Sequence, residues 1–219
     1  MVDPVSDRTR IRRLGEKAVT ERAALDTILD EGLVAHVGIT DAEQPFVMPM
    51  GYARRGDQLI LHGSSGSRLM RALGDGTPAC VTVTILDGLV YARSAFESSM
   101  NYRSAIVLGH GQRLAGDDEL DALRCLSDHL LPGRWEDIRP PSKKELAATI
   151  TVAVPLVEWS VKVSTGGPED DPADLENEPW RSIWAGHVPL RLIAEPAVTD
   201  QDVPAGTQIP AYVIEGKHR

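Results

Sequence analysis

Apolar and polar residues alternate with a period of two over several stretches of the chain, which is typical of β-strands. The alternation is clearest in residues 78–86 (PACVTVTIL), where apolar residues alternate with threonines. Residues 41–52 and 54–63 each carry an apolar run, and Gly56 and Asp57 lie where the two runs meet. This spacing predicts a β-hairpin.

Three further strands are expected after residue 86. Asp87-Gly88 is a typical hairpin-turn pair, so the chain is predicted to turn there and to continue as a strand over 89–96. Residues 101–114 (NYRSAIVLGHGQRL) form a long strand with a break at Gly109 and Gly111. The last long strand is expected over 151–163 (TVAVPLVEWSVKV).

A period near 3.6 marks the helices. Residues 20–32 form one helix, with Thr20 as its N-cap and Gly32 as its end, and its apolar face holds Ala24, Leu25, Ile28 and Leu29. Residues 117–131 form a second helix, and its apolar face holds Leu120, Leu123, Leu126, Leu130 and Leu131. Short helices are expected after Ser67 and within 140–150 (PPSKKELAATI).

The order of these elements is one helix, three strands, a short helix and three more long strands. A doubly wound parallel sheet would need a helix after nearly every strand. The pattern therefore predicts a mainly β protein with a few helices, built as a six-stranded antiparallel barrel.

The chain is expected to form one domain with extensions, because 219 residues with 42% hydrophobic content can bury one sizeable core. Residues 1–19 look like an arm that either crosses to a partner subunit or stays loose. Residues 20–195 form the domain and include an acidic loop over 164–180. Residues 196–219 look like an extended tail.

Charge and cysteine content exclude some classes of function. The net charge of −9 argues against a nucleic-acid partner, which would need a basic face. Cys80 and Cys125 are far apart in sequence and the six histidines are scattered, so a cysteine cluster is excluded and a histidine-built zinc site is not expected, while haem ligation by a single histidine stays open. No leader and no membrane-spanning run is visible, which favours a cytoplasmic protein.

The segment Leu61–Leu73 (LHGSSGSRLMRAL) has the composition of a phosphate cradle. Its glycines, Gly63 and Gly66, let the backbone approach a ligand, and its serines add hydroxyl donors at the start of a helix: Ser64, Ser65 and Ser67. Arg68 and Arg71 supply positive charge. The alternative interpretation is a capped surface helix with solvated arginines.

Several of these segments together resemble a known family. They are the strand FVMPMGY, the strand end LHG, the pair Ser67-Arg68 and the strand RSAIVLG, and they are similar to the FMN-binding split barrel of the pyridoxamine 5'-phosphate oxidase superfamily over roughly residues 20–131. RSAFESSMNYRSAIVLG, LLPGRWEDIRPPSKKEL and IWAGHVPL are most similar to its flavin-nucleotide-binding branch, which includes the nitroimidazole-reductase (Nim) type.

The resemblance implies which residues bind FMN. The strand along the flavin is matched by Val47, Met48, Pro49, Met50 and Gly51, and the phosphate side by His62, Gly63, Ser67 and Arg68. Ser64 of the cradle is added to these as a candidate for cofactor binding. Leu69 stands where the family's Ser-Arg-Lys signature has its lysine, so Arg71 or a residue of a partner chain would compensate. Further candidates for flavin contact are Ser104, Lys162 and Trp184, although a solvated Lys162 and a core or interface Trp184 are ordinary alternatives.

The expected function is that of a flavoprotein oxidoreductase that reduces a small electrophile such as a nitroaromatic. It would work as a homodimer with the cofactor at the interface, and His62 is a candidate proton donor. One alternative is a non-catalytic flavin or haem binding or sensing protein, with His62 or His110 as the haem ligand. Another is a reductase that uses a deazaflavin (F420) in place of FMN. The tail IPAYVIEGKHR lacks the pattern with which the oxidases hold a pyridoxal-type substrate.

Overall fold

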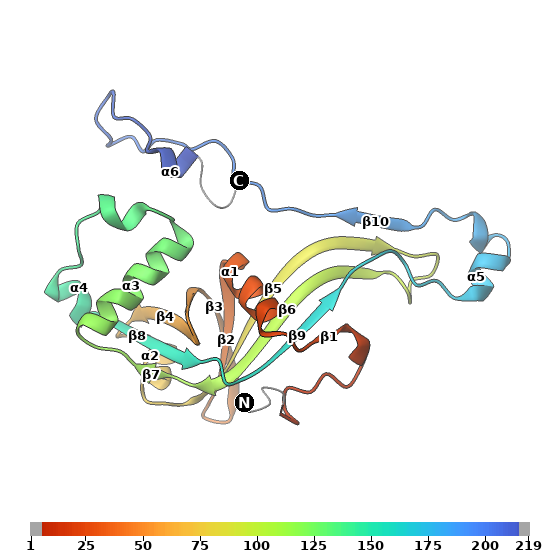
Figure 1. The fold of residues 1–219 in the computed structure, drawn as a ribbon, viewed down its shortest axis with the longest axis horizontal. Coiled ribbons are helices and arrows are strands. Elements are labelled where there is room, and N and C mark those ends of the chain that lie inside the picture. The colour runs from red at the N-terminus through yellow and green to blue at the C-terminus, as the bar shows by residue number, and fades with distance from the viewer. Residues whose placement is uncertain (1–5, 215–219) are drawn as a thin grey trace. The chain divides into compact units, whose positions relative to one another are not determined.

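The computed structural model describes residues 6–214, and within it the chain folds into two compact units (Figure 1). Within the described residues, one unit comprises 6–32, 82–106 and 158–191, and the other comprises 33–81, 107–157 and 192–214. The predicted arm and tail therefore fall partly outside the described residues, at 1–5 and 215–219.

The second unit is built on a sheet with the strand order β2-β3-β4-β8-β7. These strands are β2 (Val34–Asp41), β3 (Gln44–Arg55), β4 (Gln58–Ser64), β8 (Thr149–Pro155) and β7 (Gln112–Arg113), and the pairs are antiparallel. The predicted hairpin of β3 and β4 is confirmed, and Gly56 turns it at a φ of 59° that favours glycine.

The described part of this unit also contains the helices α2 (Arg68–Gly74), α3 (Asp117–Leu130), α4 (Lys143–Ala147) and α6 (Ala211–Ile214), and the 3-10 turn η2 (Arg134–Asp137). The helix α3 packs against β3, and α4 packs against β8 (Figure 1). A buried cluster joins α3 to the sheet and contains Ala53, Ile60, Leu114, Ala122, Leu126 and Ala153.

The first unit contains the strand order β1-β9-β6-β5, with β10 paired to β5. Its strands are β1 (Ala18–Val19), β9 (Glu158–Ser164), β6 (Ser99–His110), β5 (Pro78–Tyr91) and β10 (Gly186–Pro189), and β5 and β6 each continue into the second unit. Its helical segments are α1 (Arg22–Glu31), α5 (Pro172–Glu176), η1 (Gly15–Lys17) and η3 (Trp180–Ser182).

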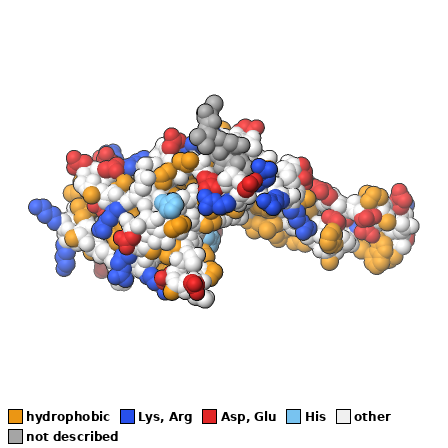
Figure 2. Space-filling view, turned by 90° about the horizontal axis from the view of Figure 1, so that it is seen from below, with side chains coloured by type: hydrophobic (Ala, Val, Ile, Leu, Met, Phe, Trp, Pro, Cys, Tyr) orange, Lys and Arg blue, Asp and Glu red, His pale blue; other side chains and the backbone are white. Residues whose placement is uncertain are grey.

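The described part of the arm contacts its own chain. Ala18 pairs with Lys162 in the β1–β9 ladder, and Arg8 forms an ion pair with Glu158. Hydrophobic side chains reach the surface between charged ones (Figure 2), and Phe96 is the most exposed aromatic residue of this unit, with 83% of its surface accessible. No helix within residues 6–214 is long and apolar enough to cross a bilayer.

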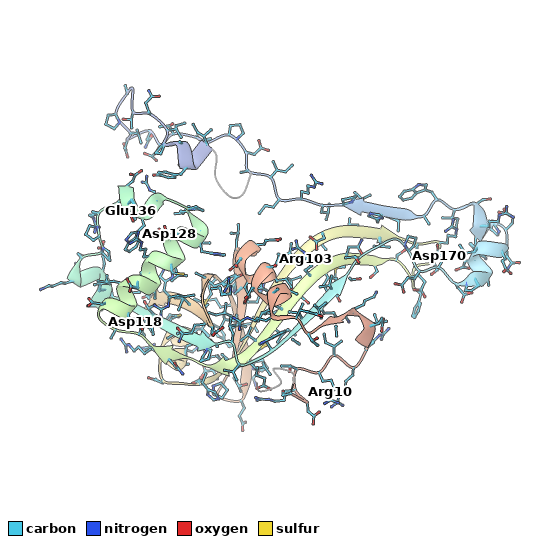
Figure 3. The ribbon with its side chains drawn as sticks, in the orientation of Figure 1. Arg10, Arg103, Asp118, Asp128, Glu136 and Asp170 are labelled. Carbon is cyan, nitrogen blue, oxygen red and sulfur yellow. The ribbon has the colours of Figure 1, made fainter. Side chains whose placement is uncertain are left out.

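The prediction of a hairpin turn at Asp87-Gly88 is wrong, because β5 runs without interruption from Pro78 to Tyr91. Asp87 accepts two hydrogen bonds, at 2.9 Å each, from Arg103 of β6, which is labelled in Figure 3. A Cβ on Gly88 would lie 3.0 Å from the carbonyl oxygen of Val188, so this glycine allows β10 to approach closely. The turn between β5 and β6 instead lies within residues 92–98.

The predicted single strand over 151–163 is also wrong. A turn at Leu156-Val157 divides it into β8 and β9, and the backbone N–H of Leu156 donates to the carbonyl of Asp57 at 2.8 Å. Residues 6–214 contain ten strands where six were expected, partly because of this division and partly because short edge strands such as β7 and β10 were not foreseen.

Two helix details differ from expectation. Glu21 occupies the N-cap position of α1, and not Thr20. In α3 only Leu126 among the five expected apolar leucines is buried, together with Ala122 and His129. The end of α1 at Gly32 and its buried face of Leu25, Ile28 and Leu29 are as predicted.

Candidate functional site

The loop between β4 and α2 is organised by its serines. The hydroxyl of Ser64 accepts the backbone N–H of Gly66 at 3.1 Å, and the carbonyl of Ser64 accepts the N–H of Ser67 at 2.9 Å. The hydroxyl of Ser67 accepts the N–H of Met70 at 3.4 Å, which confirms Ser67 as the helix cap. The N–H of Ser65 donates to Ala148 just before β8, so the loop is fixed at both ends.

This arrangement leaves donors for an anion. A hydroxyl that accepts an N–H bond still has its own proton to donate, so Ser64 and Ser67 each offer an O–H. The helix α2 has only seven residues, and its N-cap already occupies the N–H of Met70. Binding of a phosphate here would therefore depend on hydroxyl groups and arginine more than on the helix terminus.

The two arginines of the loop behave differently. The guanidinium of Arg68 forms an ion pair with Asp41 at 3.0 Å and lies over the ring of Phe46, 4.1 Å from its centroid. Its side chain is 59% exposed. The guanidinium of Arg71 donates to the carbonyl of Gly66 at 3.2 Å, so it stabilises the loop from the side.

A hollow of about 620 Å³ opens beside this loop, and we call it the serine hollow. It is lined by Phe46, Met48, Met50, His62, Gly63, Ser64, Ser67, Arg68, Leu69 and Met70. Seven of the residues predicted from the sequence are thus brought together, from Met48 and Met50 on β3 to Arg68 on α2.

The other predicted residues of this region do not line the serine hollow. Val47 and Pro49 alternate with Met48 and Met50 along β3, so their side chains point to the opposite face of the strand. A Cβ on Gly51 would meet Leu130 of α3 at 3.1 Å. Arg71 is also absent from the lining.

Three residues of the lining were not predicted. Phe46 could have been found from its period-two spacing with Met48 and Met50. Leu69 and Met70 are buried on the first turn of α2. A Cβ on Gly63 would lie 2.9 Å from Cγ of Met70, so the lack of a side chain at Gly63 makes room for Met70 and not for a ligand.

A second hollow of about 490 Å³ lies between α3, η2 and α4, and we call it the leucine hollow. Its walls are mainly apolar and consist of His62, Leu123, Leu126, Ser127, Leu130, Leu131, Trp135, Ile138, Arg139, Pro141, Glu145, Leu146 and Thr149. Four of the five leucines expected on the apolar face of α3 and just after it therefore line a hollow, although only Leu126 is fully buried.

An ion pair stands at the edge of the leucine hollow. Arg139 donates to both carboxylate oxygens of Glu145, at 2.8 and 2.6 Å. This guanidinium, together with the backbone and hydroxyl of Ser142, lowers the pKa of the Glu145 carboxyl far below its ordinary value. Ser142 and Glu145 also form the capping box of α4, which fixes the start of that helix.

His62 belongs to the walls of both hollows. It lies on β4 opposite Thr151 of β8. Burial lowers the pKa of the imidazole below its ordinary value, although the residue keeps contact with solvent. The ring is therefore mainly neutral at neutral pH, and one of its nitrogens carries a free lone pair.

The remaining candidate residues do not line either hollow. Ser104 lies on β6, Lys162 donates from Nζ to the carbonyl of Arg13 at 3.3 Å, and the ring of Trp184 lies 5.8 Å from that of Tyr91. In the unit of the two hollows, His110 has Nδ1 2.9 Å from the carbonyl oxygen of Gly76. Flavin contact by Ser104, Lys162 and Trp184 stays a prediction.

The chain matches a family of known proteins over residues 21–163, described as pyridoxamine 5'-phosphate oxidase. It is similar to the FAD and haem binding protein from Mycobacterium smegmatis, with 42% identity, a TM-score of 0.86 and coverage of 91% of this chain and 96% of that chain. It is also similar to the flavocytochrome Anf3 from Azotobacter vinelandii, with 37% identity, a TM-score of 0.89 and 97% coverage of each chain. No curated protein sequence matches the chain.

A more distant similarity connects the chain to a putative 5-nitroimidazole antibiotic resistance protein from Bacteroides thetaiotaomicron. The identity is 22%, the TM-score is 0.57, and the match covers 67% of this chain and 86% of that chain. At this identity the likeness concerns the fold alone. The predicted resemblance and the predicted split-barrel fold class are both confirmed by these similarities.

Proposed function

Because the chain belongs to the pyridoxamine 5'-phosphate oxidase family, we propose that it is a flavin-binding redox protein whose serine hollow receives a flavin phosphate. The observation that carries the proposal is the convergence of Ser64, Ser67 and Arg68 on one hollow whose other walls include Met48 and Met50. Hydroxyl donors and a guanidinium suit a phosphate, and the thioether side chains suit the less polar part of a nucleotide.

The serine hollow does not by itself distinguish FMN from FAD, because both carry a phosphate on the ribityl chain. FMN is the cofactor expected from the sequence. FAD is supported by the protein from Mycobacterium smegmatis, which is described as binding FAD and is 42% identical to this chain. We therefore propose a flavin nucleotide, FMN or FAD, as the cofactor.

The bound flavin would supply the electron-transfer chemistry, and the protein would bind and orient it. We propose that the bound flavin would take electrons from a nicotinamide donor or another reductase and would supply them to a small electrophile such as a nitroaromatic. His62 lies on the wall of the serine hollow and is the side chain there that can exchange a proton near neutral pH. Its role as a proton donor remains a prediction.

Haem binding is a second candidate function. It is supported by two proteins that share 42% and 37% of their residues with this chain, one described as binding FAD and haem and the other as a flavocytochrome. An imidazole at the edge of an apolar hollow also suits a haem group. A deazaflavin reductase is the remaining alternative, and Leu69 in place of a lysine is the feature that favours it.

We also propose a homodimer in which the second copy helps to enclose the flavin. Val34 of β2 is 48% exposed and Val47 of β3 is 61% exposed, and the two strands pair with Gly38 opposite Val47. Apolar side chains on an uncovered strand face favour association. Light scattering of the protein with and without flavin tests this, and a monomer with micromolar flavin affinity contradicts it.

The function is tested by the absorbance spectrum of the purified protein, followed by mass spectrometry of any cofactor released by heating. The stripped protein is then titrated with FMN, FAD, a deazaflavin and haemin. A tight isotherm with a flavin supports the proposal, and a haemin isotherm supports the second function. A protein that takes the deazaflavin and neither flavin contradicts the flavin assignment.

A further inference from the structure

We propose that the tip of the β2–β3 hairpin is a flap at the edge of the serine hollow, and that its strained turn controls how fast a flavin nucleotide enters and leaves. We call residues 41–46 the hairpin flap. The inference rests on the proposed flavin function and adds to it two positioning residues, Asp41 and Phe46. It is carried by a turn with an unfavourable backbone conformation and by two contacts of the flap with Arg68.

The turn of the hairpin flap has a backbone conformation that its residues disfavour. Asp41 pairs with Gln44, so the loop consists of Ala42 and Glu43 alone. Their φ angles are 46° and 65°. A two-residue hairpin loop with positive φ at both positions is the type that Asn-Gly favours, because most residues with a Cβ are strained there.

The strain of this turn is not offset by burial, because the side chains of Ala42 and Glu43 are both exposed. Within residues 6–214, three residues other than glycine have a positive φ, and these two are among them. The third, Leu14, belongs to the other unit. Strained backbone gathers at ligand clamps and switch segments, where it is part of the mechanism. The closed turn is therefore less stable than an Asn-Gly turn would be, and the tip opens more readily.

The two strands next to this turn both contact the guanidinium of Arg68. Asp41, the last residue of β2, forms an ion pair with it at 3.0 Å, and the ring centroid of Phe46 on β3 lies 4.1 Å from it. Phe46 and Arg68 both line the serine hollow. One side chain of α2 thus holds the hairpin flap. When the flap moves, the part of the wall formed by Phe46 moves with it.

The contacts that hold the flap are weak enough to break while a ligand enters. The side chains of Asp41 and Arg68 are 38% and 59% exposed, and ion pairs at such positions contribute little to stability. A phosphate that approaches Arg68 competes with Asp41 for the same N–H donors. A flavin phosphate therefore enters as the flap lifts from Arg68, and the flap closes again on the bound nucleotide.

The test uses the full chain, stripped of flavin, and follows the binding and the release of FMN, and separately of FAD, by stopped-flow fluorescence. We expect the double variant Ala42→Asn/Glu43→Gly, which relieves the strain of the turn, to lower the association and dissociation rate constants together, each by roughly fivefold. The Kd should change much less, because the flap is closed before and after binding. The melting temperature of the double variant should rise.

Leu14→Gly is the matched control, because it relieves a φ of 55° at an exposed residue of the other unit, and it should leave both rate constants unchanged. Asp41→Asn tests the contact with Arg68 and should speed association. Combined with Asp41→Asn, the double substitution in the turn should slow association less than it does alone, because both changes act on one flap.

The inference is overturned if the double variant has a raised melting temperature but binds and releases the flavin at wild-type rates, because the turn is then only a connection between strands. A melting temperature that does not rise also overturns it, since the strain is then absent. If the wild type binds neither FMN nor FAD, the proposed flavin function fails and the inference fails with it. Tight binding by the wild type together with unchanged rates in the double variant therefore marks a failure of the flap alone.

Discussion

Arg68 and Asp41 form an ion pair at 3.0 Å that places the guanidinium at the edge of the serine hollow. Phe46 supports the same guanidinium from one side, with its ring centroid 4.1 Å away. An anionic ligand in the hollow would therefore meet an arginine that is already oriented but whose charge is shared with a carboxylate. The two residues should have opposite effects on flavin affinity.

We expect Arg68→Ala to weaken flavin binding by about 1.5 kcal/mol, roughly tenfold, because it removes a hydrogen bond to a charged group at a partly exposed position. Asp41→Asn should strengthen binding by at most about fivefold, since exposed ion pairs are worth about 1 kcal/mol or less. Isothermal titration calorimetry measures both changes. Arg71→Ala is the control, and an equal loss in that variant would refute the assignment of the phosphate to Arg68.

Gly111 is predicted to tolerate no side chain. A Cβ at this position would lie 2.2 Å from the carbonyl oxygen of Leu73, a backbone atom of α2 that cannot move without moving the helix. We expect Gly111→Ala to lower the free energy of unfolding by about 3 kcal/mol, the upper range for overpacking. Thermal unfolding measures it, and Gly167→Ala, which meets no atom within 4 Å, should leave the melting temperature nearly unchanged.

Asp170 should make stability depend on pH. Its side chain is only 3% exposed and accepts the backbone N–H and the guanidinium of Arg93, both at 2.6 Å (Figure 3). The backbone N–H of Arg93 is the main cause that lowers the pKa of this carboxyl. A lowered pKa in the folded state means that the stabilisation is complete above the unfolded pKa and is lost as the pH falls through the folded one.

We therefore expect the wild type to be more stable than Asp170→Asn by a constant amount above about pH 5, and the difference to shrink below about pH 4. Denaturant unfolding at a series of pH values measures this difference. Glu176→Gln, which removes an exposed carboxylate at the end of the neighbouring helix α5, is the control. A difference that grows towards acidic pH has the wrong sign for the proposed interaction.

Loss of the capping box of α4 should loosen one wall of the leucine hollow. Ser142 accepts the N–H of Glu145, and the Glu145 carboxylate accepts the N–H of Ser142. Ser142→Ala should weaken the helix by about 1 kcal/mol. Hydrogen exchange should become faster in residues 143–147 and stay unchanged in α5, whose cap is the separate residue Asp171. Unchanged exchange in α4 would mean that its packing on β8 alone fixes the helix.

The sequence predicts those parts of the fold that are determined by residues close together in the chain. Gly56 and Asp57 mark the turn of β3 and β4, and Ser67 caps α2, because both depend on residues within a few positions. Asp87-Gly88 carries the same kind of local turn signal, but the glycine is required by the approach of Val188, a hundred residues away in sequence. The turn at Leu156-Val157 directly follows Pro155, a residue that ends strands, so this break had a local signal that the apolar run over 151–163 masked.

The candidate site likewise contains a part with local sequence signals and a part without them. The serine loop is contiguous, so its residues could be named from the sequence, and the period of two on β3 would have added Phe46. The leucine hollow was not foreseen, because an apolar helix face has the same period whether it meets a core or a cavity. Leu123 and Leu130 follow the pattern of core residues, yet they line the hollow.

His62 lines both the serine hollow and the leucine hollow, which has a consequence for protein engineering. A larger or smaller side chain at this one position changes the size of the serine hollow and of the leucine hollow together. Libraries that aim to alter what one hollow accepts should therefore leave position 62 fixed and vary Phe46 or Ile138, each of which lines one hollow alone.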